Sequence, residues 1–296
     1  MRATLIAIIL LALGATVHQT EGLMVKKYNA KHEEGGMVFI AMIAFFSMLF
    51  FVITDRDGLN FTTELLPYGI ISGVIFAATS YLTCVALGCG SFVLTNLFLS
   101  YSLLIPTFYG LLILNESATA LIYVGLAMMA VSIFFTQTKD GAREEKRSGE
   151  KTSPVWIISV ALSVIGSGLF AVMQKLQQVK FNQSCDSEFM VITLGFSAVS
   201  LLIIGTVKNA RIALTTLRRG GGYALIAGVS NGATNLLNLT VNAMLPISIA
   251  APSRSGVVIV MSFIISLLVF RERLSARQII GVAIGMAALI ILNLKI

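Results

Sequence analysis

Hydrophobic residues fall into ten segments of about 20 residues, most of them separated by short connections. A helix of about 20 apolar residues crosses a hydrocarbon core about 30 Å thick, whereas a barrel strand is about ten residues long and alternates. The pattern therefore predicts an all-α integral membrane protein with ten transmembrane helices. The segments cover residues 3–28, 36–54, 65–88, 91–114, 117–137, 154–181, 187–207, 222–245, 248–270 and 275–295.

The composition supports a membrane protein and narrows its partners. Of the 296 residues, 56% are hydrophobic and 12% are charged, about half the charged fraction of a soluble domain. The net charge is +7, but the basic residues belong mostly to the connections. There they orient a protein in the membrane and contact lipid head groups, so we expect the lipid bilayer as a partner and no nucleic acid.

No pattern in the sequence indicates a cofactor or a metal. The chain has no phosphate-binding P-loop, no dinucleotide fingerprint and no His/Cys cluster with metal-ligand spacing. Three cysteines, Cys84, Cys89 and Cys185, form no metal-type pair, and their odd number argues against a disulfide framework. We expect no cofactor and no metal, and ATP-driven transport would need another chain.

The second half of the chain repeats the first. Matching residues recur at offsets of 153, 155 and 156, and the offset changes within connections, where insertions are tolerated. The matches include Ser47 with Ser200, Gly73 with Gly228, and Glu116 with Glu272. We predict two five-helix repeats, residues 1–137 and 154–296, joined by a solvated linker, residues 138–153. Because five is an odd number, the second copy enters the membrane from the opposite side, which gives an inverted repeat with an expected site near the midplane.

The first segment has a second interpretation. Met1–Ala15 resembles a signal peptide, because one arginine precedes an apolar core and small residues follow. The repeat pairs this segment with residues 154–181, so cleavage would leave the first repeat one helix short. We expect the segment to remain as a transmembrane helix.

An amide stripe runs along the eighth segment. Asn231, Asn235, Asn238 and Asn242 are spaced by four, three and four residues, so at about 100° per residue they share one helix face. Amides can simply join helices, and such bonds contribute about 0.6 kcal/mol on average in membranes. Four in register favour the alternative, a polar cavity that binds substrate, with Asn235 and Asn238 at its centre.

Arg254 lies about six residues inside the ninth segment, after Pro252. A long cationic side chain can extend to the nearby membrane surface. Alternatively, proline weakens the helix there, and a broken helix at depth is where transporters bind charged groups. An arginine suits a carboxylate or a phosphate, because its planar guanidinium binds both oxygens.

Ionisable residues interrupt the first segment. His18 and Glu21 are three residues apart and share a helix face, which makes them candidates for proton coupling or substrate contact. Gln174 and Lys175 occupy the matching place on the sixth segment and are candidates for the same roles. The alternative is that these positions lie near the membrane surface.

Two tyrosines and two glutamates complete the candidates. Tyr81 and Tyr101 lie within the third and fourth segments, where each either lines the cavity or packs against neighbouring helices. Glu116 and Glu272 lie between paired helices, where a carboxylate caps free N–H groups at a helix start. We assign the glutamates a structural role and no contact with substrate.

Charge also predicts an orientation. The connections after the odd-numbered segments carry 15 basic residues, and the opposite face carries five. The positive-inside rule places the more basic face in the cytoplasm, which leaves both chain termini outside.

Short motifs complete a resemblance to a known family. Glu116-Ser-Ala-Thr119 with Gly125, and Glu272-Arg-Leu-Ser275 with Gly281, occupy equivalent places in the two repeats. With ten helices in two repeats, the chain resembles the ten-helix EamA-type transporters of the drug/metabolite transporter superfamily. The resemblance implies transport of small metabolites, alternating access and a central cavity. It also implies cytoplasmic termini, against the charge count.

These observations favour a secondary transporter of a small polar metabolite, with an anionic metabolite as the narrower expectation. We expect a multi-pass protein of the plasma membrane, a monomer or homodimer that exports metabolites and has no enzymatic activity. One alternative is a lipid-carrier flippase on the same fold, which would need a lateral opening. Another is an intramembrane enzyme, for which His18 and Glu21 are the only acid–base candidates.

Overall fold

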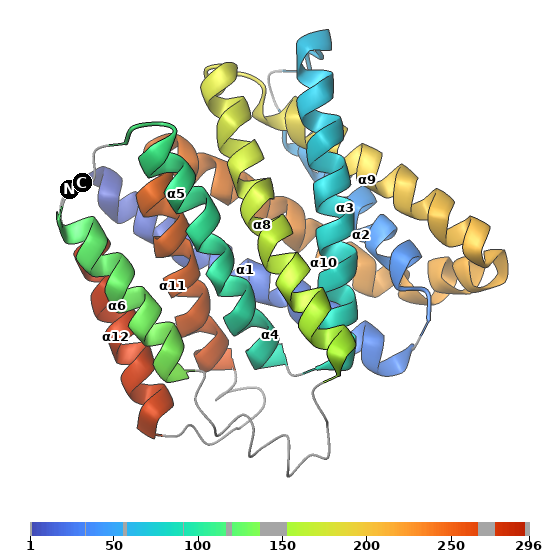
Figure 1. Ribbon diagram of the computed structural model, residues 1–296. Coiled ribbons are helices and arrows are strands. Elements are labelled where there is room, and N and C mark those ends of the chain that lie inside the picture. The colour runs from blue at the N-terminus through green and yellow to red at the C-terminus, as the bar shows by residue number, and fades with distance from the viewer. Residues whose placement is uncertain are drawn as a thin grey trace.

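Ten helical segments run through the part of the chain that the computed structural model describes, residues 2–32, 34–55, 58–90, 92–116, 120–136, 153–265 and 276–293 (Figure 1). The first half contains α1 (Arg2–Lys31), α2 (Gly36–Thr54), η1 (Thr63–Leu65), α3 (Leu66–Cys89), α4 (Phe92–Leu99), η2 (Ser100–Leu103), α5 (Leu104–Leu112) and α6 (Ala120–Thr136). The second half contains α8 (Pro154–Lys180), α9 (Asp186–Lys208), α10 (Ala210–Met244), α11 (Ile247–Ile265) and α12 (Ala276–Asn293).

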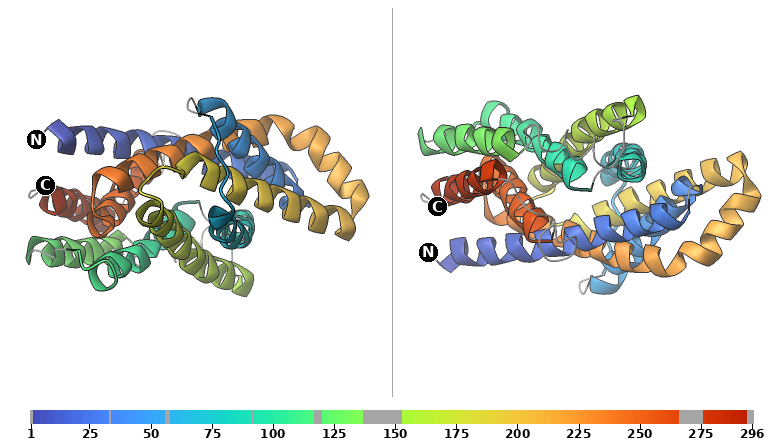
Figure 2. Two further views of the ribbon diagram at one scale, coloured as in Figure 1. Left: turned by 90° about the horizontal axis from the view of Figure 1, so that it is seen from above. Right: turned by 90° about the horizontal axis from the view of Figure 1, so that it is seen from below.

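The predicted fold class is confirmed. The structure has ten helical segments among the described residues, with α4, η2 and α5 together forming the fourth. Four of them, α2, η1–α3, α8 and α9, are long and apolar enough to cross a membrane by length and composition alone. The chain starts α1 and ends α12 on the same side of the molecule (Figures 1 and 2), as an even number of crossings requires.

Two segments differ from the sequence prediction in their course. The fourth is not one helix, because the four residues of η2 tighten it to a 3-10 turn between α4 and α5. Pro106 follows shortly and has no N–H to donate to the carbonyl of Ser102, which weakens the helix at this point. The eighth begins at Ala210, twelve residues before the predicted start at residue 222.

The early start of α10 has a local cause. The side-chain oxygen of Asn209 accepts hydrogen bonds from the backbone N–H groups of Arg211 and Ile212, both at 3.1 Å. An asparagine in this position caps a helix, and the cap favours starting the helix here. The 35 residues of α10 span about 52 Å, so the helix is longer than a hydrocarbon core is thick.

Contacts between the halves follow a two-fold pattern. Helices α1 and α2 of the first half both pack on α10 of the second. Their repeat counterparts, α8 and α9, both pack on α3 of the first half. Counterparts also contact each other, namely α2 with α9, α5 with α11 and α6 with α12. This is the arrangement of two similar five-helix units related by a two-fold axis. The exact boundaries of the repeats remain predictions.

Glycines allow two equivalent helix crossings to close tightly. A Cβ atom at Gly228 would lie 2.8 Å from the backbone oxygen of Ile43, and one at Gly73 would lie 2.9 Å from that of Thr193. In each crossing a serine hydroxyl donates to the glycine carbonyl at 2.7 Å, Ser47 to Gly228 and Ser197 to Gly73. Packing therefore pairs Ser47 with Ser197, three residues away from Ser200, the partner suggested by matching letters.

Some predicted features lie outside the described residues. These are most of the linker at residues 138–153, the Glu272–Ser275 motif, and residues 117–119 of the first motif. Glu116 itself is described.

Candidate functional site

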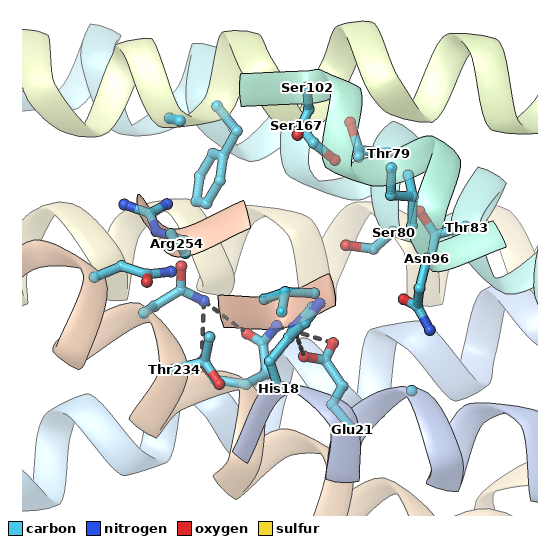
Figure 3. A pocket seen from close by; sticks show the side chains of 18 of the residues that line it. His18, Glu21, Thr79, Ser80, Thr83, Asn96, Ser102, Ser167, Thr234 and Arg254 are labelled. Atoms are coloured by element: carbon cyan, nitrogen blue, oxygen red, sulfur yellow. Dashed lines mark hydrogen bonds and ion pairs between the residues drawn. The ribbon is translucent and has the colours of Figure 1, made fainter. Parts of the chain in front are cut away.

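A pocket of about 250 Å³ lies between the two halves (Figure 3). Its walls come from both halves, chiefly α1, α3 and the α4–η2–α5 segment on one side and α8, α10 and α11 on the other. Seven of the predicted site residues line it: His18, Glu21, Gln174, Asn231, Asn235, Asn238 and Arg254.

Hydrogen-bonded side chains cross the pocket wall from one half to the other. The Gln174 amide donates to Asn235 Oδ1 at 2.9 Å, and Asn235 Nδ2 donates to Asn231 Oδ1 at 3.1 Å. Asn231 Nδ2 donates in turn to Glu21 Oε1 at 3.0 Å. We call these four residues the amide chain. It connects α8 to α1 through two asparagines of α10.

Ser47 contacts the amide chain from α2. Its hydroxyl lies 2.9 Å from Asn231 Oδ1, while it also contacts the carbonyl of Gly228. Because an ionised carboxylate only accepts hydrogen bonds, the Asn231 amide presents its nitrogen to Glu21 and its oxygen to Asn235. His18 adds a second contact, with Nδ1 3.7 Å from Glu21 Oε2.

Arg254 brings a positive charge to the pocket. Its Nη2 donates to Asn242 Oδ1 at 3.0 Å, while the buried Nε atom has no hydrogen-bond partner among the residues that the structure describes. Among the described residues, no carboxylate lies within 4.0 Å of the guanidinium. A guanidinium without a counter-ion inside a membrane protein is costly unless an anion binds.

Helix α11 is continuous through Arg254, so the broken helix considered as one alternative for this residue is not observed. Pro252 lies inside a continuous helix from Ile247 to Ile265. The first turn is well capped: the Glu116 oxygens accept the N–H groups of Ile247 and Ser248, both at 2.9 Å. The Pro246 carbonyl accepts the next two, from residues 249 and 250. All four free donors of the helix start are satisfied, so one proline does not interrupt it.

Four predicted residues lie outside the pocket lining. Asn242 is fully buried behind the wall, where its backbone oxygen accepts from Lys175 Nζ at 2.7 Å. Tyr81 packs against the buried cluster around Tyr28, and the Tyr101 ring lies 6.2 Å from that of Phe98. Both tyrosines contact neighbouring side chains in this structure, and neither is in the pocket lining.

Sequence analysis missed much of the wall contributed by the first half. Thr79, Ser80, Thr83, Asn96 and Ser102 line the pocket there. Ser80 and Thr83 precede Asn235 and Asn238 by 155 residues, one of the repeat offsets, but this relation alone does not place them at a pocket. Asn96 gave no signal, because a single asparagine in an apolar run forms no periodic pattern.

The site holds few groups suited to catalysis or metal binding. The titratable or charged side chains in the lining are His18, Glu21, Cys84 and Arg254. Over the described ranges, no three His, Cys, Asp or Glu residues are grouped so as to hold a metal ion. The chemistry of the wall is that of a binding site rich in amides and hydroxyls.

Comparison with known proteins agrees with this architecture. No curated protein sequence matches the chain. The second half does match a family described as the EamA-like transporter family. Residues 154–294 form an EamA domain. It contains α8, α10 and α11, the three helices of the second half that line the pocket.

A solved structure extends the likeness to the whole chain. A crystal structure of a protein that is 12% identical superimposes with a TM-score of 0.65 and covers 100% of this chain and 99% of that chain. At this identity the likeness shows the fold alone. The EamA-like match in the second half and the apolar helices support a membrane protein, and they suggest a transporter of the drug/metabolite type.

Proposed function

We propose that the chain is a secondary transporter that moves a small anionic metabolite through the central pocket by alternating access. The observation that supports this most directly is Arg254, a cation at the pocket with no carboxylate within 4.0 Å in the described part of the chain. A carboxylate or phosphate on the substrate would supply the missing counter-ion, and a guanidinium holds either with two hydrogen bonds.

The size of the pocket supports a small substrate. Its volume of about 250 Å³ is just below the range of about 300–1,000 Å³ typical of small-molecule sites. Such a space suits a compound of a few carbon atoms. It is small for a lipid carrier, so the flippase alternative has less support.

Alternating access is consistent with the placement of the pocket. Its walls come from both halves, and the mirrored contacts of α1 with α10 and α8 with α3 flank it. If one half rocks against the other, the same side chains face first one side of the membrane and then the other. A substrate that binds one state more tightly shifts the population toward that state. We place this activity in the plasma membrane, as export.

Proton coupling belongs to the same proposal. Glu21 lines the pocket, receives the Asn231 amide and lies beside His18. A proton on this pair would change the charge of the pocket without closing it. Lys175 and Gln174, the other candidates, differ in position: Gln174 ends the amide chain inside the lining, whereas Lys175 binds the end of α10 outside it.

The test is a thermal-shift screen of purified protein against hydroxy acids, sugar phosphates, dicarboxylates, amino acids and nucleosides. A ligand of the native state raises the melting temperature by mass action. We expect an anion to stabilise the wild type and to lose its effect in Arg254→Gln. Arg277→Gln, an exposed arginine outside the lining, is the matched control and should keep the effect.

Two results would overturn the proposal. One is stabilisation by neutral nucleosides with none by any anion. The other is an anion effect that survives Arg254→Gln unchanged. Stabilisation by long-chain lipid phosphates, in preference to short anions, would support the flippase.

A further inference from the structure

The pocket has a second polar region, far from Arg254. Ser80 and Thr83 of α3 and Asn96 of α4 lie at one end of the pocket in Figure 3, and Arg254 lies at the other. We call these three residues the polar wall. Ser80 and Thr83 are three residues apart and therefore share a face of α3.

Asn96 is an unpaired donor in this wall. Its side chain is 7% exposed, and its Nδ2 atom has no hydrogen-bond partner in the described part of the protein. An amide buried without a partner is unfavourable, and native structures satisfy nearly all such groups. Asn96 lines the pocket, so a turn of its amide would bring this buried donor to a molecule bound there.

The hydroxyl groups of Ser80 and Thr83 also lack the usual hydrogen bond to their own helix. Elsewhere in the helices, threonines bond to the carbonyl four residues earlier, as Thr107 does to Leu103 at 2.7 Å and Thr240 does to Leu236 at 2.8 Å. Over the described ranges, Ser80 and Thr83 make no such bond. A hydroxyl that does not bond its own helix is able both to donate and to accept.

From these contacts we infer that the substrate is a polyhydroxylated anion, with its acidic group at Arg254 and its hydroxyl groups at Ser80, Thr83 and Asn96. This rests on the proposed function and names the substrate class of the same pocket. Substrate hydroxyls both donate and accept, as these three side chains require together. A purely apolar tail would leave all three unpaired.

Glu21 fits the same assignment. One of its oxygens accepts the Asn231 amide and the other lies 3.7 Å from His18, so this carboxylate is already engaged on its own side of the pocket. A carboxylate repels a second anion but accepts hydrogen bonds from hydroxyl groups. The acidic end of the substrate is therefore directed to Arg254, and hydroxyl groups are tolerated near Glu21.

The test compares matched anions that differ only in their hydroxyl groups. Dissociation constants are measured for glycerate against propionate and for glycerol 3-phosphate against propyl phosphate, using the purified full chain. The two pairs separate a carboxylate from a phosphate as the acidic group. We expect the hydroxylated member of at least one pair to bind about tenfold more tightly, since a site built to bond hydroxyl groups discriminates against analogues that lack them.

Two substitutions test whether this preference for hydroxylated anions comes from Asn96 and Thr83. In Asn96→Leu, and independently in Thr83→Val, the preference for the hydroxylated anion should fall by about three- to tenfold, while binding of the deoxy anion stays unchanged. Thr240→Val, whose hydroxyl bonds its own helix, is the matched control and should keep the full preference. If one variant does not fold, the other carries the test.

Two outcomes overturn this inference and leave the proposed function standing. They are equal binding of hydroxylated and deoxy anions by the wild type, and an unchanged preference in both wall variants. Failure of every anion to bind, by contrast, overturns the proposed function and this inference together.

Discussion

Glu21 of α1 and Gln174 of α8 occupy equivalent positions in the two halves, 153 residues apart, and stand at opposite ends of one amide chain. The fold thus brings two copies of one position to the same pocket and gives them different chemistry. One is a carboxylate that accepts from Asn231, and the other is an amide that donates to Asn235. The direction of hydrogen bonding from α8 to α1 follows from this difference.

Removing the charge of Arg254 should separate stability from binding. Its guanidinium lacks a counter-ion in the described residues, so removing it leaves no carboxylate unpaired and relieves the cost of burying an uncompensated charge. We expect Arg254→Met to keep or raise the melting temperature of the ligand-free protein while it abolishes stabilisation by anions. A large fall in the ligand-free melting temperature would instead assign Arg254 to the framework of the fold.

Ser47 and Ser197 provide a matched pair of substitutions. Each hydroxyl donates to a glycine carbonyl at an equivalent helix crossing, but only Ser47 also contacts Asn231. We expect Ser47→Ala and Ser197→Ala each to lower stability by about 1 kcal/mol. Only Ser47→Ala should weaken substrate binding, by several-fold, because it releases the Asn231 amide. Equal binding by the two variants would argue against a role for the amide chain in recognition.

Glu116 should act on the pocket from a distance. It caps the start of α11, and Arg254 lies six residues after Ser248 on that helix. We expect Glu116→Ala to cost about 1–2 kcal/mol of stability, as for loss of a helix cap, and to weaken anion binding. The exposed carboxylate of Glu64 serves as the control, since Glu64→Ala should change neither. A loss of stability with unchanged binding would limit Glu116 to capping.

Proton coupling makes a prediction for flux. In proteoliposomes, a pH gradient should drive accumulation of the substrate by the wild type, and Glu21→Gln should retain exchange of substrate but lose the response to the gradient. The measurement is uptake of labelled substrate at several internal and external pH values. An unchanged response in Glu21→Gln would remove Glu21 from the coupling mechanism.

Periodic features of the fold and the site were predictable from sequence. The ten apolar segments specify the helices, and regular spacing identified Asn231, Asn235 and Asn238 as one face, which lines the pocket. His18 and Glu21 stood out because ionisable residues are rare in apolar segments, and they too are in the lining.

The rest depended on packing. The sequence does not show whether a serine or threonine hydroxyl bonds its own helix or faces a cavity. Ser80 and Thr83 could therefore not be distinguished from Thr107. Matching letters paired Ser47 with Ser200, nearly one helical turn away from its partner in packing, Ser197. A shift of about one turn keeps a residue on the same helix face, so the sequence pattern fits either serine. The glycine contacts fit only the pairing of Ser47 with Ser197.

The two halves have diverged unevenly, and this has a consequence for evolution. Gly73 and Gly228, which hold equivalent crossings together, are the same residue, whereas Ser80 and Asn235, which line the pocket, are not. A duplicated unit can change its cargo by altering the pocket face of one copy while the other copy keeps its contacts. New substrate specificities can then arise through substitutions in one half of the pocket, while the helix crossings stay unchanged.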